Sequence, residues 1–266
     1  MMNLNLLMLD LRIKATSSIS WFVCLVLIVF LYVCLFPSIS HAPGVDQFLQ
    51  QLPQGLREAF AIQDYSTPAG YLQTEIFSGL VPVVVLVLVI GRGGAAIAGE
   101  EEVDRLEIVM AQPLSRNSLY FSKVASLLLT VFFAVFVAVF GTIALVGPLV
   151  SLHVSIAALL GMCVHLFVFA VLAAALALAG GAALGHKTAG IALAGAVFAI
   201  GFLVETIGRS VSWLAHVRPV SPWHWYSGSS PLLNGINWVD VGVLAGATVL
   251  TLGVGAWLFN RRDLRG

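Results

Sequence analysis

Charge is the scarcest property of this 266-residue sequence. Only 13 basic and 13 acidic residues are present, so charged residues make up 10% of the chain, against about 25% in soluble domains. Hydrophobic residues make up 59%, and the mean hydropathy is +0.99. Two stretches, Ala15–Val45 and Val124–His186, contain no charged residue. An uncharged apolar run of about 18 residues or more is long enough to span a bilayer, which excludes an ordinary soluble domain.

Cysteine is also scarce, and neither sign of charge is in excess. The three cysteines lie inside apolar runs, where a thiol behaves as a small hydrophobic group, so neither a disulfide framework nor a metal motif is expected. The net charge is zero, which gives no argument for a nucleic-acid partner. We therefore expect no metal ligands, and membrane lipids as the surroundings.

Apolar runs between charges predict six membrane-spanning helices. The predicted spans are 19–36, 76–98, 119–146, 154–179, 189–207 and 239–259. The first is expected to stop at Pro37, because proline cannot continue the helical hydrogen bonding. The fold class is therefore an all-α integral membrane protein, with residues 1–266 forming one transmembrane domain.

The distribution of lysine and arginine predicts the orientation. With the N-terminus inside, the outer side holds only Arg57, Arg209 and Arg218, and the other ten basic residues lie inside. Basic residues concentrate in cytoplasmic segments. We expect both termini to be cytoplasmic, in a multi-pass protein of the cytoplasmic membrane.

The N-terminal region imitates a signal peptide, with Lys14, an apolar stretch and a small-residue motif at Ser40–Ala42. The apolar stretch is longer than the 7–15 residues or so of a signal peptide, so a retained helix is predicted. Leu4, Leu7 and Leu11 before it predict a short amphipathic stretch along the inner surface.

The densest cluster of charge, Gly99–Arg116, lies in the predicted inner loop between spans two and three. Val103, Leu106 and Met110 recur at helical spacing, which predicts a short amphipathic helix over about 100–112. Its acids gather at its N-terminus, where the helix dipole favours them. Pro113 is expected to end this helix, and Ser115 to cap the next one.

Two interpretations of this loop remain open on physical grounds. It is either an acidic interfacial helix that only decorates the surface or a docking element for a cytosolic partner. Its length, charge density and proline turn favour docking slightly.

Three segments carry a resemblance to a known family. The first is the inner loop, which matches at Gly99–Glu102, Leu106–Glu107 and Pro113–Arg116, followed by Lys123. The second is Ser221–Tyr226, followed by Pro231-Leu232 and Asn234-Gly235. The third is Leu258–Leu264. In this order they resemble the permease subunit of ABC-2 type ABC transporters over essentially the whole chain. Asp104-Arg105 and Ser122 depart from the usual family pattern without changing its frame.

The resemblance implies the membrane half of an ATP-driven exporter, in a homodimer or a heterodimer with a second permease. A separate cytosolic ATPase subunit would bind ATP and Mg²⁺. The substrate transported by the exporter would be an amphiphile such as a drug, lipid or peptide. The loop helix would then be the coupling helix, with acids pairing with basic residues of the ATPase. The implied ATPase-coupling residues are Glu100, Glu101, Glu102, Leu106, Glu107, Met110, Pro113 and Arg116.

The outer segment 208–238 holds four of the six tryptophans. One interpretation is an aromatic belt at the membrane interface. The other, implied by the resemblance, is a re-entrant outer gate. The implied gate residues are Pro222, Trp223, Trp225 and Tyr226.

No catalytic or cofactor-binding residue is expected in the chain itself. Gly180–Thr188 approaches a phosphate-binding loop, but His186 displaces the lysine by one position and the segment follows a membrane helix. A membrane-embedded enzyme or an ion-coupled secondary carrier are the alternative functions. Both would need polar or acidic groups at mid-membrane depth, which these spans almost lack.

The few ionisable residues in the spans have simple explanations. Arg92 is expected to reach toward the lipid headgroups, and Glu205 to pair with Arg209 one turn away. His165 is expected to be a hydrogen-bonded interior histidine, and a metal site at His216 and His224 is disfavoured because no carboxylate or thiol is near in sequence.

Small residues at intervals of four predict close helix packing within one subunit or between two. They are Gly91, Ala95 and Gly99 on the second span and Gly242 and Gly246 on the sixth.

Overall fold

The computed structural model describes residues 4–40, 67–103, 115–209 and 211–262. Within these ranges every regular element is a helix, and six helices are long and apolar enough to cross a membrane. This confirms the predicted fold class and the number of spans. The six spans are Ala15–Ile39, Pro68–Ala95, Arg116–Val150, Ile156–Leu184, Lys187–Gly208 and Trp238–Arg261.

The spans are built from several kinds of helix, of which η1 and η2 are π-helical and η3 and η4 are 3₁₀ turns. In chain order the elements are α1 (Leu4–Ile13), α2 (Ala15–Ser40), α5 (Pro68–Tyr71), η1 (Leu72–Leu80), α6 (Val81–Ala95), α7 (Ala98–Glu101), α9 (Arg116–Phe132), η2 (Phe133–Phe140), α10 (Gly141–Val146), η3 (Gly147–Val150), α11 (Ile156–Leu184), α12 (Lys187–Gly208), α13 (Ser212–Ala215), η4 (Arg218–Val220), α14 (Pro222–Ser227), α15 (Pro231–Asn234) and α16 (Trp238–Arg261).

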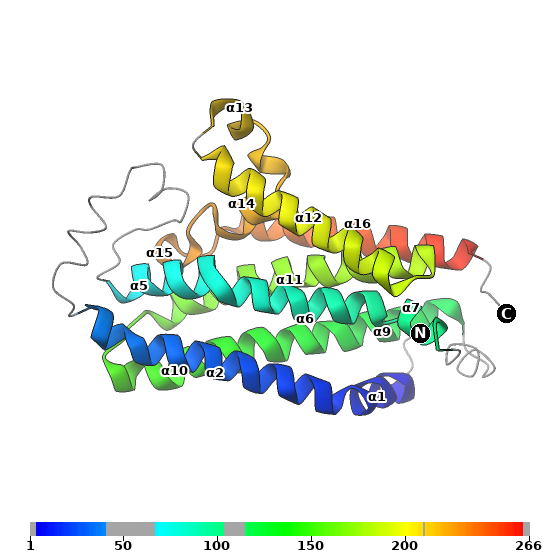
Figure 1. The fold of residues 1–266 in the computed structure, drawn as a ribbon, viewed down its shortest axis with the longest axis horizontal. Helices are drawn as coiled ribbons and strands as arrows, with labels where there is room; N and C mark the ends of the chain where they lie inside the picture. The colour runs from blue at the N-terminus through cyan, green and yellow to red at the C-terminus, as the bar shows by residue number, and fades with distance from the viewer. Residues whose placement is uncertain (1–3, 41–66, 104–114, 210, 263–266) are drawn as a thin grey trace.

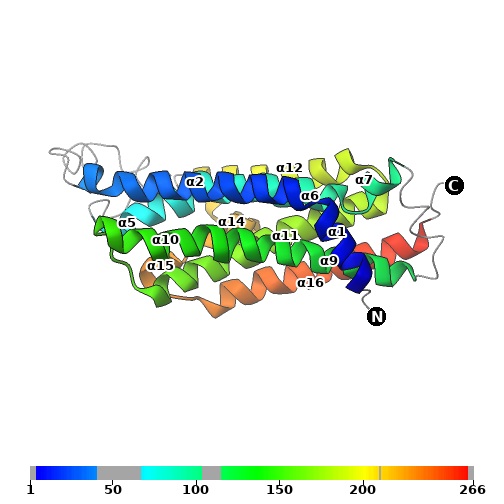
Figure 2. The same cartoon turned by 90° about the horizontal axis from the view of Figure 1, so that it is seen from below.

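The helices run roughly parallel to the long axis of the molecule (Figure 1). α1 and the end of α16 lie at the same end of the bundle, together with α7, and we call this the terminal end. The helices α5 and α15 lie toward the opposite end, which we call the far end, and α14 lies between that end and the middle of the bundle. Viewed from below, α1 lies at an angle to α2 across the terminal end (Figure 2).

The first span does not end at Pro37, so that prediction is wrong. α2 continues through Pro37 to Ser40. Proline removes one backbone donor, but it lies within the last turn of α2, so little helix follows it. The ends of the other spans shift too: the second begins at Pro68 rather than at residue 76, because Thr67 caps its first turn by accepting a hydrogen bond from the Gly70 amide at 3.1 Å.

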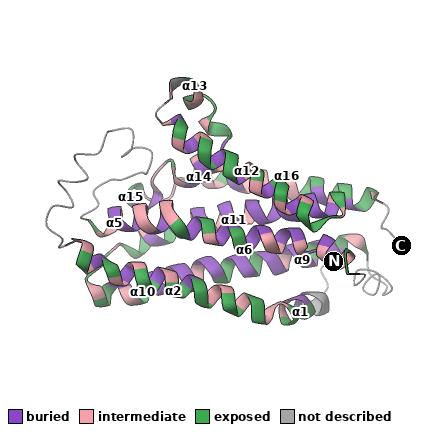
Figure 3. Cartoon of the chain, viewed as in Figure 1, coloured by how far each residue is buried: buried purple, intermediate pink, exposed green. Residues whose placement is uncertain are grey.

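The central helix of the bundle is α11, which packs against α6, α12 and α16. In its most apolar stretch 56% of the residues are buried, against 22% for α2 and for α16. The same gradient is visible in Figure 3, where the outer helices carry exposed faces. The exposed residues on those faces are largely apolar, among them Leu27, Val249 and Leu250, which suits contact with lipid.

Close packing around α11 relies on glycines other than the predicted ones. A Cβ on Gly93 would lie 2.5 Å from the carbonyl oxygen of Ala174, and one on Gly190 would lie 2.4 Å from that of Ala177. By contrast, a Cβ on Gly242 or Gly246 would meet no atom within 4 Å. These two glycines therefore make no close helix contact within the described subunit.

Candidate functional site

Three consecutive glutamates, Glu100, Glu101 and Glu102, follow the second span at the terminal end, and we call them the acidic triplet. The chain leaves α6 at Ala95 and re-enters a short helix, α7, at Ala98. The carbonyl of Ile97 accepts hydrogen bonds from the amides of Glu100 and Glu101, at 3.0 and 3.1 Å. This turn directs the three side chains toward different neighbours.

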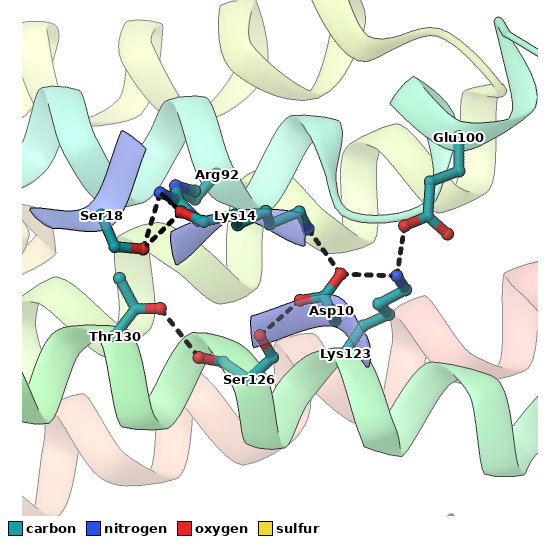
Figure 4. A network of polar contacts seen from close by, with 8 residues as sticks. All are labelled: Asp10, Lys14, Ser18, Arg92, Glu100, Lys123, Ser126 and Thr130. Atoms are coloured by element: carbon teal, nitrogen blue, oxygen red, sulfur yellow. Dashed lines mark hydrogen bonds and ion pairs between the residues drawn. The ribbon is translucent and has the colours of Figure 1, made fainter. Parts of the chain in front are cut away.

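Glu100 forms an ion pair with Lys123 of α9. The ammonium of Lys123 also lies 2.7 Å from Asp10 of α1, whose carboxylate lies 2.8 Å from Lys14 and accepts a hydrogen bond from Ser126. In Figure 4 Lys123 lies between the two carboxylates. The side chains of Asp10 and Lys123 are only 4% and 7% exposed, so the contacts exclude most of the water that would otherwise screen them.

The electrostatics of Asp10 follow from these neighbours. Burial raises the pKa of its carboxyl group, but the opposing charges and hydrogen bonds of Lys14 and Lys123 outweigh this, and the pKa falls from 3.8 to about 2. Asp10 is therefore ionised at neutral pH, as its role between two ammonium groups requires.

Glu101 pairs with Arg262 at the end of α16. Arg262 also donates a hydrogen bond of 2.7 Å to the carbonyl of Ala182 on α11, and Arg116 donates to the carbonyl of Arg262 at 2.5 Å. The guanidinium of Arg262 packs beside Gly185, where a Cβ would lie 2.6 Å from it. One carboxylate thus joins α7 to the ends of both α11 and α16.

Glu102 accepts a hydrogen bond of 2.8 Å from the backbone amide of Lys187, the first residue of α12. A carboxylate there satisfies an amide that lacks a partner inside its own helix, and it interacts favourably with the helix dipole. The triplet therefore contacts α9, α16 and α12 through successive residues, in addition to following α6 directly.

Arg92 extends this connection to the first span. Its guanidinium donates to the hydroxyl of Ser18 on α2 at 2.9 Å and to the carbonyl of Lys14 at 3.2 Å (Figure 4). Arg92 was expected to reach toward the lipid headgroups, and the structure adds two partners within the chain, both bound by one terminal nitrogen of its guanidinium.

Part of the predicted coupling segment cannot be placed. Leu106, Glu107, Met110 and Pro113 lie outside the described residues. Ser115 does cap α9 as predicted, since its hydroxyl accepts a hydrogen bond of 3.2 Å from the amide of Ser118. The acids of the triplet were expected to pair with basic residues of an ATPase. In the structure, each of these glutamates already has a partner within the chain.

The predicted gate residues lie on α14, which contacts the middle of α11 and of α12 in the half of the bundle nearer the far end. Pro222 is the first residue of α14, and the hydroxyl of Ser221 caps this helix while donating to the carbonyl of Gly201 at 2.8 Å. Trp223 donates from its indole nitrogen to the carbonyl of Phe198 at 2.9 Å. Trp225 donates to the carbonyl of Pro219 at 2.7 Å, within the same segment.

Tyr226 joins α14 to the second span. Its hydroxyl donates to the carbonyl of Phe77 at 2.7 Å. The helix is irregular there, since Gly79 has non-helical backbone angles and Pro82 has no amide hydrogen. A tyrosine from a distant segment thus binds a carbonyl at a kink.

The aromatic rings of α14 form a buried cluster with α11 and α12. The ring of Phe169 stacks on Tyr226 at a centroid distance of 4.5 Å and meets Trp223 and Phe198 edge-on at 4.9 Å. Trp223 and Tyr226 are 4% and 0% exposed, whereas Trp213 is 69% exposed. An aromatic belt at the membrane interface therefore suits exposed Trp213, but not Trp223 and Tyr226, which are buried inside the bundle.

An ionic cluster sits beside these rings. Buried Glu205 pairs with Arg209 at 3.2 Å, as predicted, and with Arg218 at 2.6 Å. The hydrogen bond to Glu205 raises the pKa of Arg218, against the effect of burial. Sequence reasoning missed Arg218 because it lies 13 residues from Glu205, beyond any helical spacing, and the only signal was its position in the same outer segment.

The histidines differ from one another in their surroundings. His165 is completely buried and its Nδ1 lies 3.0 Å from the carbonyl of Gly161, which confirms a hydrogen-bonded interior histidine. His224 lies 3.5 Å from Glu205, so a carboxylate is near it after all. Still, the described ranges contain no group of three potential metal ligands.

Comparison with known proteins gives one match. A family model described as ABC-2 family transporter protein matches residues 4–264, nearly the whole chain. No curated protein and no solved structure matches the sequence. The matched region includes both the acidic triplet and α14.

Proposed function

We propose that this chain, which belongs to the ABC-2 family of transporter proteins, is the membrane-spanning permease subunit of an ATP-driven exporter. A separate cytosolic ATPase binds ATP and Mg²⁺ and docks on the loop between the second and third spans. The ten basic residues expected inside support a cytoplasmic terminal end, with both termini inside.

The observation that carries this proposal is the acidic triplet. Glu100, Glu101 and Glu102 connect one short segment to α9, to α16 with α11, and to α12. A segment attached to so many spans can pass a displacement at the membrane surface to all of them together. This is what a subunit driven by an external ATPase needs, because its own spans must move when the ATPase closes.

Two further features support a non-catalytic subunit. The glycine-rich segment that approaches a phosphate-binding loop belongs to the end of α11, where Gly185 has a φ of 76° and caps the helix. That context differs from the strand, loop and helix that a phosphate-binding loop requires. The buried charged side chains of the described part lie near the ends of the spans: Asp10, Lys123, Glu205 and Asp240. This placement does not suit an ion-coupled carrier or a membrane-embedded enzyme.

The helix α14 is the outer gate. Trp223 and Tyr226 fill the space between α11 and α12 with rings, and Tyr226 holds the second span through Phe77. Opening would separate these contacts as α12 or the second span moves. The proposed substrate is amphiphilic, in keeping with the aromatic rings of α14 that would part to let it pass.

The subunit acts as a homodimer or a heterodimer with a second permease. Gly242 and Gly246 on the exposed face of α16 have no close neighbour in the subunit, which leaves them free to let another helix approach.

Purification of the tagged chain from its native membrane tests the partnership directly. An ATPase is expected to co-purify and to hydrolyse ATP, and Leu106→Asp is expected to remove it by placing a charge on an apolar anchor. Val220→Asp is the matched control, because Val220 is 80% exposed beside α14, away from the terminal end. If no ATPase co-purifies, or if Leu106→Asp leaves both binding and export unchanged, the proposed coupling role is wrong.

A further inference from the structure

A cavity of about 400 Å³ lies beside the acidic triplet at the terminal end. Four parts of the chain line it: α1 with Lys14 after it, the segment from the end of α6 through α7 to Val103, α9, and the start of α12. A water molecule occupies about 30 Å³ of liquid, so the cavity is far larger than a structural water requires. Its volume falls in the range of about 300–1,000 Å³ that is typical of small-molecule sites.

The walls of the cavity carry both signs of charge. Three ammonium groups and three carboxylates line it, and most of them neutralise each other within the network of Asp10, Lys123 and Glu100. Two groups differ. Lys187 makes no side-chain ion pair within the described ranges, and Glu102 uses one oxygen to bind a backbone amide rather than a cation. The cavity thus offers one cation and one carboxylate that a ligand of both charges would satisfy.

The wall that α1 contributes to the cavity carries exposed apolar side chains. Leu9 and Ile13 line it from α1 and are 50% and 59% exposed. α1 lies at the end of the spans, at the depth of the lipid headgroups if the spans cross the membrane, and its exposed apolar residues suit an interfacial helix. The cavity and α1 together thus offer a polar site beside an exposed apolar surface, as an amphiphilic ligand requires.

We propose that this cavity binds the phosphoethanolamine headgroup of a phospholipid from the adjacent leaflet. The phosphate pairs with the ammonium of Lys187, and the primary ammonium of the lipid donates hydrogen bonds to Glu102. A choline headgroup has no N–H to donate and is typically bound by aromatic cages, but no described lining residue is aromatic. An anionic headgroup without an ammonium would leave the carboxylate of Glu102 facing negative charge.

Native mass spectrometry of the purified full chain in detergent tests this site. The probes are phosphatidylethanolamine, phosphatidylcholine and phosphatidylglycerol with identical acyl chains, added at equal concentrations. We expect about tenfold stronger retention of the ethanolamine lipid, which corresponds to one charge-assisted hydrogen bond. Lys187→Met should reduce that retention about tenfold, and Arg12→Met, which removes an exposed cation of α1 outside the cavity lining, should not.

Glu102→Gln distinguishes the lipids more finely. The amide oxygen of glutamine can still accept the hydrogen bond from the start of α12, so the fold is retained while the charge is lost. Retention of the ethanolamine lipid should then fall to that of the choline lipid. Equal retention of all three lipids by the unmodified chain, preference for phosphatidylglycerol, or no effect of Lys187→Met would each overturn the proposal. It does not depend on the transported substrate or on the ATPase.

Discussion

The two ends of the bundle hold their helices together by different physical means. At the terminal end, two ion pairs and one hydrogen bond of the acidic triplet join α9, α16 and α12 to one short segment, and Lys123 extends this network to Asp10 of α1. At the other end, the rings of α14 pack against α11 and α12, and hydrogen bonds run from side chains to single carbonyls. The ion pairs described there, from Glu205 to Arg209 and Arg218, join α12 only to the residues that follow it in the chain.

This difference matches the tasks proposed for the two ends. An ion pair of low exposure resists separation, because parting the charges leaves each of them poorly solvated. Aromatic contacts are non-directional by comparison, so rings can separate and repack around an amphiphile. The terminal end is therefore suited to transmit a displacement, and the far end to open in response.

The largest expected effect concerns Lys123. Lys123→Met leaves Asp10 and Glu100 without their shared cation, and removal of one partner from a buried pair costs about 3–5 kcal/mol of stability. Thermal unfolding in detergent should show a large fall in Tm. Arg261→Met, at an exposed cation that stacks on Trp257, is the control and should shift Tm little. An equal, small shift for both variants would mean that the network is not a stabilising link.

The lowered pKa of Asp10 makes the stability of the folded chain depend on pH. Because the folded pKa is about 2 and the usual value is 3.8, the ionised carboxylate contributes about 2 kcal/mol. This contribution is fully present above about pH 4 and is lost as the pH falls toward 2. The stability difference between the unmodified chain and Asp10→Asn should therefore be constant from pH 7 to pH 5 and shrink in acid. A difference that grows in acid would contradict the assigned direction.

In α14, Tyr226→Phe should have a moderate effect. The ring stays stacked on Phe169, but the carbonyl of Phe77 loses its partner, which costs about 1–2 kcal/mol for a buried acceptor. Trp225→Phe removes an exposed hydrogen bond and should cost less. In proteoliposomes Tyr226→Phe should also raise passive leakage of substrate, as expected for a weakened gate. An unchanged rate of passive leakage would show that Tyr226 does not hold the gate closed.

The smallest expected effect on stability is that of Glu102→Ala. A carboxylate at a helix N-terminus contributes about 0.3–1 kcal/mol, and this one is exposed. Thermal unfolding should show a small decrease in Tm that added salt reduces further. A decrease as large as that of Lys123→Met would show that Glu102 has a different role.

Local patterns in the sequence predicted the parts of the structure that depend on neighbouring residues. The six spans follow from uninterrupted apolar runs, and the Ser115 cap and the Glu205–Arg209 pair follow from spacings of three and four residues. The early start of the second span was missed because Gln73, Thr74 and Glu75 make its first turns polar.

Long-range contacts could not be predicted in this way. Arg262 lies 161 residues from Glu101, Lys123 lies 113 from Asp10, and Tyr226 lies 149 from Phe77. Each contact depends on how the spans pack around α11, which no single segment specifies. The charges of the triplet were visible in the sequence, but their partners required the fold.

The most direct test of the central claim is the double variant Glu100→Gln, Glu101→Gln, assayed with the partner ATPase in proteoliposomes. We expect that the ATPase still binds, because these carboxylates have partners inside the permease, and that transport per ATP hydrolysed falls sharply. If instead ATPase binding is lost while the stability of the permease is unchanged, the acids contact the ATPase directly, and the triplet is not the link between the spans.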